Sequence, residues 1–203
     1  MRDIGVLPDS VRVHGVLHDS RVNGPGRRAV VHLQGCTLGC PGCFNPETHD
    51  AHGGRVVGVA ALADELLSRA PEGVTVSGGE PFQQLEGLTA LLTRLRPRVE
   101  SLLVFSGYSL EELQALPGAG LALELLDVVV AGRYVVGERR PGAFAASANQ
   151  RIHCLTDKHS PEAFGAGGVE ISILPDGRIV MTGFPDAALR RAVRSLGEGG
   201  ATS

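Results

Sequence analysis

Short apolar runs alternate with amphipathic helical patterns through the middle of the chain. The runs predicted as strands are 29–33, 73–78, 101–107 and 126–132, and the segments predicted as helices are 59–70, 85–96 and 109–116. Ser109 and Glu112 have the spacing of a helix capping box. Continuous apolar runs are typical of strands buried on both faces of a parallel sheet. Because alternating strands and helices form right-handed βαβ units, we expect an α/β core, either a doubly wound sheet or a partial barrel.

The C-terminal part of the chain follows a different pattern. Residues 169–183 read as two strands joined at Pro175-Asp176-Gly177, which is a hairpin signal, and 186–196 read as a short helix. We therefore expect two parts: a core over residues 1–155, and an extension over 156–203 that packs on it.

Composition and charge narrow the class of protein. The chain has 203 residues, a net charge of -3 and a hydrophobic fraction of 43%, which suits one globular domain with an appendage. Its arginines are scattered without a basic run, so we expect no nucleic-acid partner. The N-terminus lacks the apolar region of a secretory signal, and no apolar stretch approaches the roughly 18 residues of a membrane span. A cytoplasmic protein with reduced thiols and no membrane partner is expected.

Three of the four cysteines fall within one short segment. Cys36, Cys40 and Cys43 are close together, whereas Cys154 is more than a hundred residues away. The thiols could be incidental, although the glycines and proline among them make poor core material. They could bind zinc, with Cys154, His49 or His32 as the fourth ligand. They could also hold an iron–sulfur cluster and leave one iron without a protein ligand.

Unusual sequences follow each of the predicted strands. The cysteine segment follows 29–33, "SGGEP" follows the next strand, and "SGY" and "AGRY" follow the last two. Ligands of such sheets bind at the carboxyl ends of the strands. The strand order along the chain therefore predicts that these sequences meet in one active site.

These motifs carry a family resemblance. Cys36-x3-Cys40-x2-Cys43 resembles the cluster motif of the radical S-adenosylmethionine (radical SAM) superfamily. The segment 21–50 resembles the opening of the activating proteins of anaerobic ribonucleotide reductase. "VSGGEPFQQ", "FSGYSLEEL", "DVVVAGRY" and "SANQRI" follow in the order that this family uses, so that the resemblance covers roughly residues 10–155. It implies a partial (β/α) barrel of radical SAM type with parallel strands.

The resemblance also implies a chemistry. Cys36, Cys40 and Cys43 would hold three irons of a single 4Fe–4S cluster, and the open iron would bind the amino and carboxylate groups of SAM. Reductive cleavage of SAM would give a 5′-deoxyadenosyl radical that abstracts a hydrogen atom. The cofactors would supply this chemistry, and the protein would position them and exclude water from the site.

The resemblance assigns further residues to SAM. "SGGEP" (Ser77, Gly78, Gly79 and Glu80) would bind the amine, with glycine carbonyls as acceptors and Glu80 adding a charge-assisted bond. Phe44 would pack near the adenine or shield the cluster, unless it only serves the core. The remaining candidates are Ser106 for the carboxylate or ribose, Arg133 for the carboxylate, and Ser147, Asn149 and Gln150 near the cofactor.

The resemblance implies a glycyl-radical enzyme as the partner and a flavodoxin- or ferredoxin-like protein as the electron donor. Two features are compatible with an alternative, in which the enzyme abstracts hydrogen directly from a small molecule or peptide. They are Ala131, where relatives often carry Asp, and the extension after residue 165. A non-enzyme alternative is an iron–sulfur electron carrier, for which Cys154 would be essential, or a zinc module.

Overall fold

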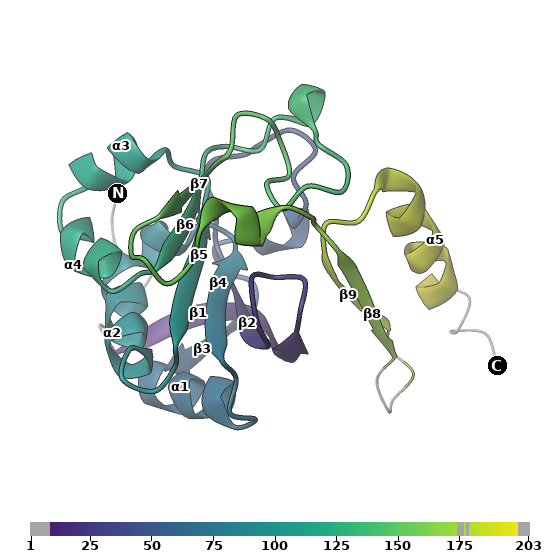
Figure 1. Cartoon of the computed structure of the whole chain (residues 1–203). Coiled ribbons are helices and arrows are strands. Elements are labelled where there is room, and N and C mark those ends of the chain that lie inside the picture. The colour runs from purple at the N-terminus through teal and green to yellow at the C-terminus, as the bar shows by residue number, and fades with distance from the viewer. Residues whose placement is uncertain (1–8, 174–176, 178, 199–203) are drawn as a thin grey trace.

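The structure, a computed structural model, describes residues 9–173, 177 and 179–198. Among these residues, seven strands form one sheet in the order β3-β1-β2-β4-β5-β6-β7 (Figure 1). The central strands β2 (Arg28–Leu33), β4 (Gly73–Gly78), β5 (Ser101–Ser106) and β6 (Val128–Ala131) run parallel. The flanking strands β1 (Ser10–Ser20), β3 (Arg55–Gly58) and β7 (Arg151–Cys154) are antiparallel to their neighbours.

Four helices cover one face of this sheet. They are α1 (Val59–Leu67), α2 (Leu85–Leu95), α3 (Leu110–Ala115) and α4 (Ala119–Glu124), and their apolar residues share one buried cluster with the sheet. Short 3-10 turns lie at η1 (Pro46–Thr48), η2 (Pro81–Gln84), η3 (Val136–Glu138) and η4 (Pro161–Phe164). No helix in the described ranges has both the length and the apolar character that crossing a membrane requires.

Side-chain alternation along the central strands produces two cores. Val74, Val76 and Val104 point toward the helices and are fully buried. On the opposite face, Leu103 and Val130 join a smaller cluster built around aromatic rings such as Phe144 and Phe164. This burial on both faces explains why the central strands read as continuous apolar runs.

The predicted α/β class is confirmed, and the strands and helices of the core lie at the predicted positions to within a few residues. The capping box is present: Glu112 N–H donates to Ser109 Oγ at 3.2 Å, and Ser109 N–H donates to Glu112 Oε2 at 2.8 Å. The sheet is open, with β3 and β7 at its edges, and no barrel closes among the described residues. The strands β1, β3 and β7 and the helix α4 were not predicted as elements of the core.

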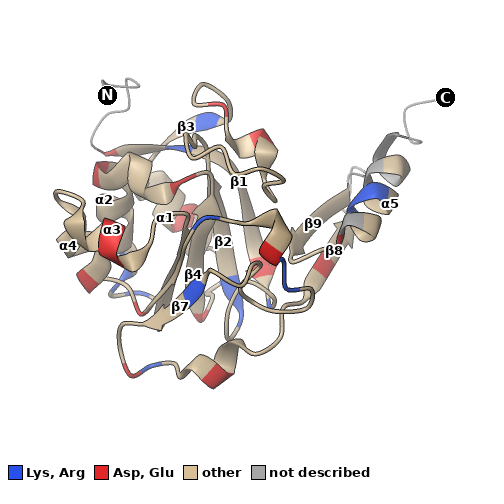
Figure 2. Ribbon diagram, turned by 90° about the horizontal axis from the view of Figure 1, so that it is seen from above, with Lys and Arg blue, Asp and Glu red and all other residues tan. Residues whose placement is uncertain are grey.

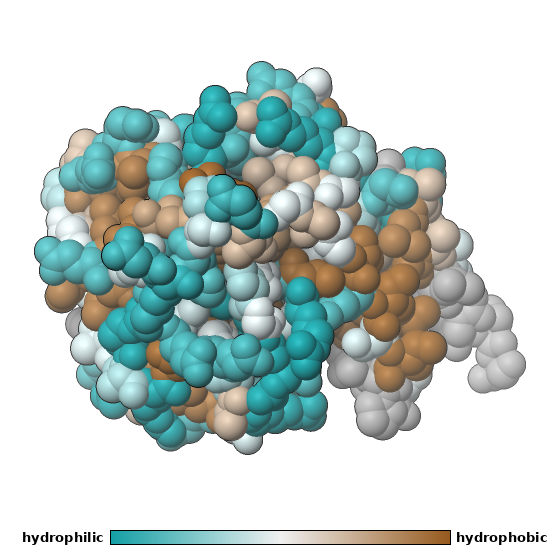
Figure 3. Space-filling view, in the orientation of Figure 1, coloured by the Kyte–Doolittle hydropathy of each residue, from teal (hydrophilic) through white to brown (hydrophobic). Residues whose placement is uncertain are grey.

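The C-terminal hairpin and helix are present as separate elements. The strands β8 (Val169–Ile173) and β9 (Ile179–Gly183) pair with each other, and α5 (Ala187–Glu198) follows. The predicted Pro175-Asp176 turn lies outside the described residues. In Figure 1 these elements stand on the side of the sheet away from α1–α4. The hairpin exposes Ile171 and Ile173, which are 49% and 76% accessible, and apolar surface is visible over it in Figure 3.

Two polar contacts attach the hairpin to the loop that follows β1. The amide of Asn23 donates to Thr182 Oγ1 at 2.8 Å, and Arg21 N–H donates to Glu170 Oε1 at 2.8 Å. Asn23 and Thr182 are both buried. The hairpin is thereby held against the loop between β1 and β2.

Candidate active site

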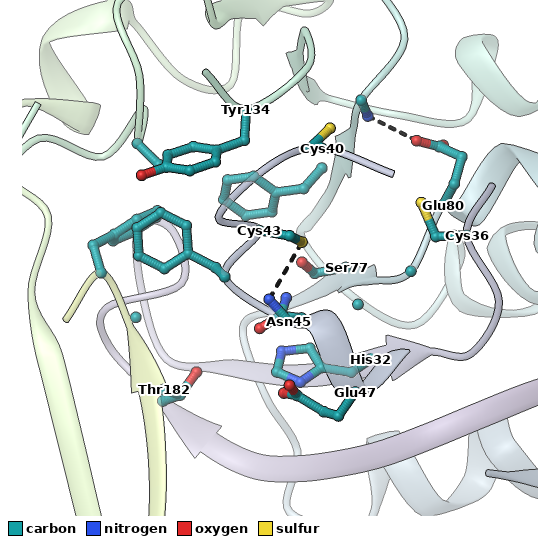
Figure 4. A pocket seen from close by; sticks show the side chains of 18 of the residues that line it. His32, Cys36, Cys40, Cys43, Asn45, Glu47, Ser77, Glu80, Tyr134 and Thr182 are labelled. Carbon is teal, nitrogen blue, oxygen red and sulfur yellow. Dashed lines mark hydrogen bonds between the residues drawn. The ribbon is translucent and has the colours of Figure 1, made fainter. Parts of the chain in front are cut away.

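A cavity of about 310 Å³ lies at the carboxyl ends of β2, β4, β5 and β6 (Figure 4). Each of these strands is followed by a segment that lines it, as predicted from the order of the motifs. The residues that line the cavity on this side include Cys36, Cys40, Cys43, Phe44, Ser77, Gly78, Gly79, Glu80, Ser106, Gly107, Gly132 and Gln150. The parallel arrangement of the strands therefore creates the site.

Hydrogen bonds join the two ends of the cysteine loop. Gly35 N–H donates to Thr48 O at 2.7 Å, and Cys36 N–H donates to His49 O at 3.2 Å. The buried side chain of Gln34 donates to the carbonyls of Glu47 and Asp50 at 3.1 and 2.8 Å. These bonds hold both ends of the loop against β2 while its tip, with Cys40, reaches over the cavity.

The three thiols are half-buried and free. Cys43 Sγ accepts a hydrogen bond from Asn45 N–H at 3.4 Å, and Cys43 N–H donates to Cys40 O at 3.1 Å. Burial raises the pKa of the Cys36 and Cys43 thiols above the ordinary value. Thiolates at these positions therefore need a compensating positive charge, which a metal centre provides.

The loop suits a cluster better than a single ion. In the part of the chain that the structure describes, no three side chains of His, Cys, Asp or Glu surround a point where one metal ion would sit. A 4Fe–4S cube makes a different demand, because each thiolate binds a different iron. The sulfurs need to surround the cube and not to meet at one atom. Three cysteines that line one cavity, on a loop with positive φ at Gly39 and Gly42, fit that demand.

Gly78 and Gly79 allow β4 to pass directly against the start of the cysteine loop. A Cβ on Gly78 would lie 2.4 Å from Leu33 O, and a Cβ on Gly79 would lie 2.3 Å from Gly35 O. Gly78 also has a φ of +100°. The close approach lets Gly79 N–H donate to Leu33 O at 2.8 Å and Glu80 N–H donate to Gly35 O at 2.9 Å. The two glycines thus fix the position of the cysteine loop.

Glu80 is buried, with 1% of its surface accessible, and it accepts three hydrogen bonds from its surroundings. Phe82 N–H and Ser106 Oγ donate to Oε1 at 3.0 and 2.9 Å, and Gly107 N–H donates to Oε2 at 2.7 Å. Burial raises the pKa of Glu80 to about 7, and the bonds from Gly107, Phe82 and Ser106 limit the rise. A carboxylate has roughly four acceptor sites, so that one remains for a ligand.

The hydroxyl of Ser106 is engaged within the protein. It donates to Glu80, and it accepts from Tyr108 N–H at 3.1 Å. Ser77 lines the cavity at the end of β4 (Figure 4). Phe44 lines it as well, with its ring 4.9 Å from the ring of Tyr134 in an edge-to-face contact.

The structure places Arg133 away from the residues that line the cavity. Its guanidinium pairs with Glu112 at 2.9 Å on the surface, and it lies 5.7 Å from the ring of Tyr108. The predicted contact of Arg133 with a SAM carboxylate would require this ion pair to open.

The segment around Ser147 braces the loop that carries Arg133. Ser147 Oγ donates to Asn149 Oδ1 at 2.7 Å, and Asn149 Nδ2 donates to Arg133 O at 2.7 Å. Gln150 Nε2 donates to Gly132 O at 3.1 Å. Of the three predicted residues in this segment, only Gln150 lines the cavity.

Several lining residues carried no assigned role in the sequence. His32, considered above only as a zinc ligand, lines the cavity from β2. Burial, followed by the charge of His14, lowers the pKa of His32 to about 4. The C-terminal extension contributes Met181, Thr182, Gly183, Phe184, Pro185, Arg190 and Val193. The sequence predicted a hairpin and a helix in this part of the chain, but these patterns did not indicate that the two elements line the cavity.

Cys154 lies on β7 and packs against the aromatic cluster on that face of the sheet. It is not among the residues that line the cavity. A cluster held by four protein thiolates would therefore require Cys154 to leave its strand. The arrangement favours three thiolate ligands and an open iron.

Comparison with known proteins agrees with this geometry. Residues 22–153 match a family described as "4Fe-4S single cluster domain". The anaerobic ribonucleoside-triphosphate reductase-activating protein of Escherichia coli (strain K12) is 30% identical over 145 residues, which cover 66% of this chain and 92% of that protein. The protein of the same name from Salmonella typhimurium is 31% identical over 157 residues, 71% of this chain and 99% of that protein.

A shorter match extends to a second kind of activating enzyme. The pyruvate formate-lyase-activating enzyme of Clostridium pasteurianum is 40% identical over 87 residues, which cover 40% of this chain and 37% of that enzyme. The matched domain contains the cysteine loop and the glycines that hold it. The chain therefore belongs to the 4Fe-4S single cluster domain family and, with these activating proteins, to the radical SAM superfamily.

Proposed function

We propose that this radical SAM enzyme activates a glycyl-radical enzyme by removing a hydrogen atom from a glycine of that partner. The observation that carries the proposal is the placement of the cysteines. Cys36, Cys40 and Cys43 line one cavity together with Gly78–Glu80, whereas Cys154 lies outside it. The names of the relatives support the kind of partner.

The chain would hold its cofactors at the carboxyl ends of the parallel strands. Cys36, Cys40 and Cys43 would bind three irons of the 4Fe–4S cluster. When bound, the cluster and SAM together supply a 5′-deoxyadenosyl radical for hydrogen abstraction. The protein's part is to fix the ligand against the cluster and to exclude water from it.

The residues predicted to contact SAM fall into two groups, those that are free to bind it and those that already bond within the protein. The carbonyls of Gly78 and Gly79, with the remaining acceptor site of Glu80, would receive the ammonium of SAM. Ser77, Gln150 and the ring of Phe44 would contact other parts of the ligand. The remaining predicted residues, Ser106, Arg133, Ser147 and Asn149, would act mainly by holding the loops after β5 and β6 in place.

A second candidate is direct hydrogen abstraction from a small molecule or a peptide. One observation favours it: the extension forms part of the cavity wall, through residues such as Thr182 and Phe184. A wall at that position narrows the approach for a loop of a large partner. We also propose a flavodoxin- or ferredoxin-like electron donor, and a division of the chain into a core up to residue 155 and an extension beyond it.

The test is anaerobic reconstitution with iron and sulfide, followed by SAM and dithionite. We expect 5′-deoxyadenosine, detected by mass spectrometry, from the wild type and from Cys154→Ala, and none from Cys40→Ala. Addition of the glycyl-radical enzyme from the same genome should then give a glycyl-radical signal in electron paramagnetic resonance. Formation of 5′-deoxyadenosine without that signal would favour the second candidate. A cluster that forms but leaves SAM intact would contradict both.

A further inference from the structure

The cavity contains a guanidinium that the C-terminal extension contributes. Arg190, on α5, lines the cavity, and its Cζ lies 3.9 Å from the centroid of the Phe44 ring. Phe44 follows the cluster ligand Cys43 directly. The helix α5 lies outside residues 22–153, so the family domain does not include this contact. Figure 2 shows basic residues on α5.

Arg190 forms no ion pair within the described part of the chain, although the nearby groups of Tyr134, Cys43 and Glu47 favour its positive charge. Arg190 Nη1 donates to Phe44 O at 3.4 Å, which is a long hydrogen bond to a neutral carbonyl. A second guanidinium, that of Arg139, lies 5.4 Å from the same ring and donates to Pro185 O at 2.5 Å. None of the ion pairs among the described residues involves either arginine. Burial, and then the charge of Arg139, lowers the pKa of Arg190.

The acidic residues that line the cavity do not neutralise this pair. Glu80 already accepts hydrogen bonds from Phe82, Ser106 and Gly107. Glu47 lines the cavity but forms no ion pair with Arg190 among those of the described residues. Arg133, by contrast, forms an ion pair with Glu112 on the surface. Two like charges thus lie on the Phe44 ring, and that of Arg190 faces the cavity, an arrangement that an anionic ligand would stabilise.

The ring fixes the orientation of the guanidinium. Phe44 is held from its edge by Tyr134, at 4.9 Å between ring centroids, and Arg190 stacks on its face. A stacked guanidinium keeps N–H donors along its rim, and their planar fork matches the two oxygens of a carboxylate.

We propose that Arg190 is a carboxylate-recognition residue of the cavity. This inference rests on the proposed function, since it takes the cavity as the place where SAM and the substrate meet. Two sources can supply the carboxylate. One is the methionine part of SAM. The other is a small-molecule or peptide substrate of the second candidate function, because a glycine within a partner protein has no free carboxylate. In both cases the extension takes part in choosing the ligand.

The experiment measures binding to the reconstituted 4Fe–4S protein under anaerobic conditions. Two pairs of probes are titrated by calorimetry: SAM with decarboxylated SAM, and, in SAM-loaded protein, N-acetylglycine with its neutral amide. Arg190→Gln is compared with the wild type. Arg191→Gln is the matched control, because Arg191 is an exposed neighbour that does not line the cavity. Arg190→Lys tests whether the planar fork is needed.

We expect Arg190→Gln to weaken one carboxylate probe by about tenfold or more, since a charge-assisted hydrogen bond is lost. Its neutral counterpart should bind with unchanged affinity, and Arg191→Gln should match the wild type for all four probes. A loss in the first pair assigns the carboxylate to SAM, and a loss in the second assigns it to the substrate. Arg190→Lys should recover part of the affinity.

Equal affinities of the wild type and Arg190→Gln for both carboxylates would overturn the inference. So would an equal loss for the carboxylate and neutral members of a pair, because it would indicate a packing role on Phe44. Failure of the wild type to bind either SAM probe is a different result: it would contradict the proposed function.

Discussion

The backbone N–H of Gly107 donates a 2.7 Å hydrogen bond to Oε2 of Glu80, which joins the ends of two neighbouring parallel strands. Oε1 of the same carboxylate accepts from Ser106 Oγ and Phe82 N–H. One buried side chain therefore ties the turn at Phe82 to the end of β5 at Ser106 and Gly107. The motif that the sequence associates with SAM also organises the protein itself.

Glu80→Gln should destabilise the fold by about 1–3 kcal/mol, the cost of a buried donor without a partner. Glutamine has one oxygen, whereas two backbone N–H groups point at the oxygens of Glu80, from Phe82 and Gly107. One of these donors will face an amide NH₂ group. Urea denaturation of the apo-protein measures the loss. Glu124→Gln on the exposed surface of α4 is the control, and an equal effect in both variants would contradict this account.

Gly79→Ala should impair both the fold and the uptake of iron. Its Cβ would lie 2.3 Å from the backbone oxygen of Gly35, which side-chain motion cannot relieve. We expect a loss of about 1–3 kcal/mol, as for other overpacked sites, and less iron bound per chain after reconstitution. Gly120→Ala is the matched control, because its Cβ would meet nothing within 4 Å and α4 would gain a better helix former. Normal iron content in Gly79→Ala would show that the loop can move without cost.

Single serine substitutions should separate the four cysteines into two groups. Cys36→Ser, Cys40→Ser and Cys43→Ser remove thiols that line the cavity, and each should lose most of the iron and the visible absorption of the cluster. Cys154→Ser should retain both, since Cys154 packs on β7. Iron and sulfide analysis after anaerobic reconstitution measures the outcome. Loss of the cluster in Cys154→Ser would support the electron-carrier alternative.

His32 should make the apo-protein less stable in acid. Burial lowers the pKa of His32 to about 4 from an ordinary value of 6.5, so the unfolded chain binds the proton at higher pH. The contribution of neutral His32 is fully present above pH 6.5 and declines as the pH falls toward 4. The loss is at most about 3 kcal/mol.

Denaturation of wild type, His32→Gln and the exposed control His52→Gln across this pH range isolates the effect. His32→Gln should lose less stability on acidification than the other two proteins. Parallel pH profiles in all three would mean that His32 titrates normally.

The sequence was most informative where local chemistry determines structure. The central strands and the cap of α3 at Ser109 follow from apolar runs and from residue spacing. The convergence of the cysteine loop with Gly78–Glu80 follows from the parallel order of the strands, and all of these residues line the cavity.

The flanking strands β1, β3 and β7 escaped prediction because each is only partly buried. In β1, Val11 and Val13 face the core, whereas Arg12 and His14 point outward, and irregular pairing interrupts the strand. This alternation gives no continuous apolar run. The strand β7 has only four residues, from Arg151 to Cys154, too few for a pattern to stand out.

The sequence also could not predict which side chains contact each other across the fold. The ion pair between Arg133 and Glu112 depends on how the loop after β6 meets α3, and the contact between Arg190 and Phe44 depends on where α5 docks. Both contacts arise from tertiary packing between segments far apart in the chain. A residue type at one position, such as arginine after a strand, does not reveal which acid or ring it will meet.

The hydrogen bond between Asn23 and Thr182 spans 159 positions of the chain. A ribosome releases Asn23 and the cysteine loop well before it releases Thr182, and domains begin to fold as they emerge. During that interval the sheet can assemble while one side of the cavity still lacks its wall. In a nascent chain that has not yet reached Thr182, the cavity and its three thiols lack the wall that the hairpin supplies in the folded protein.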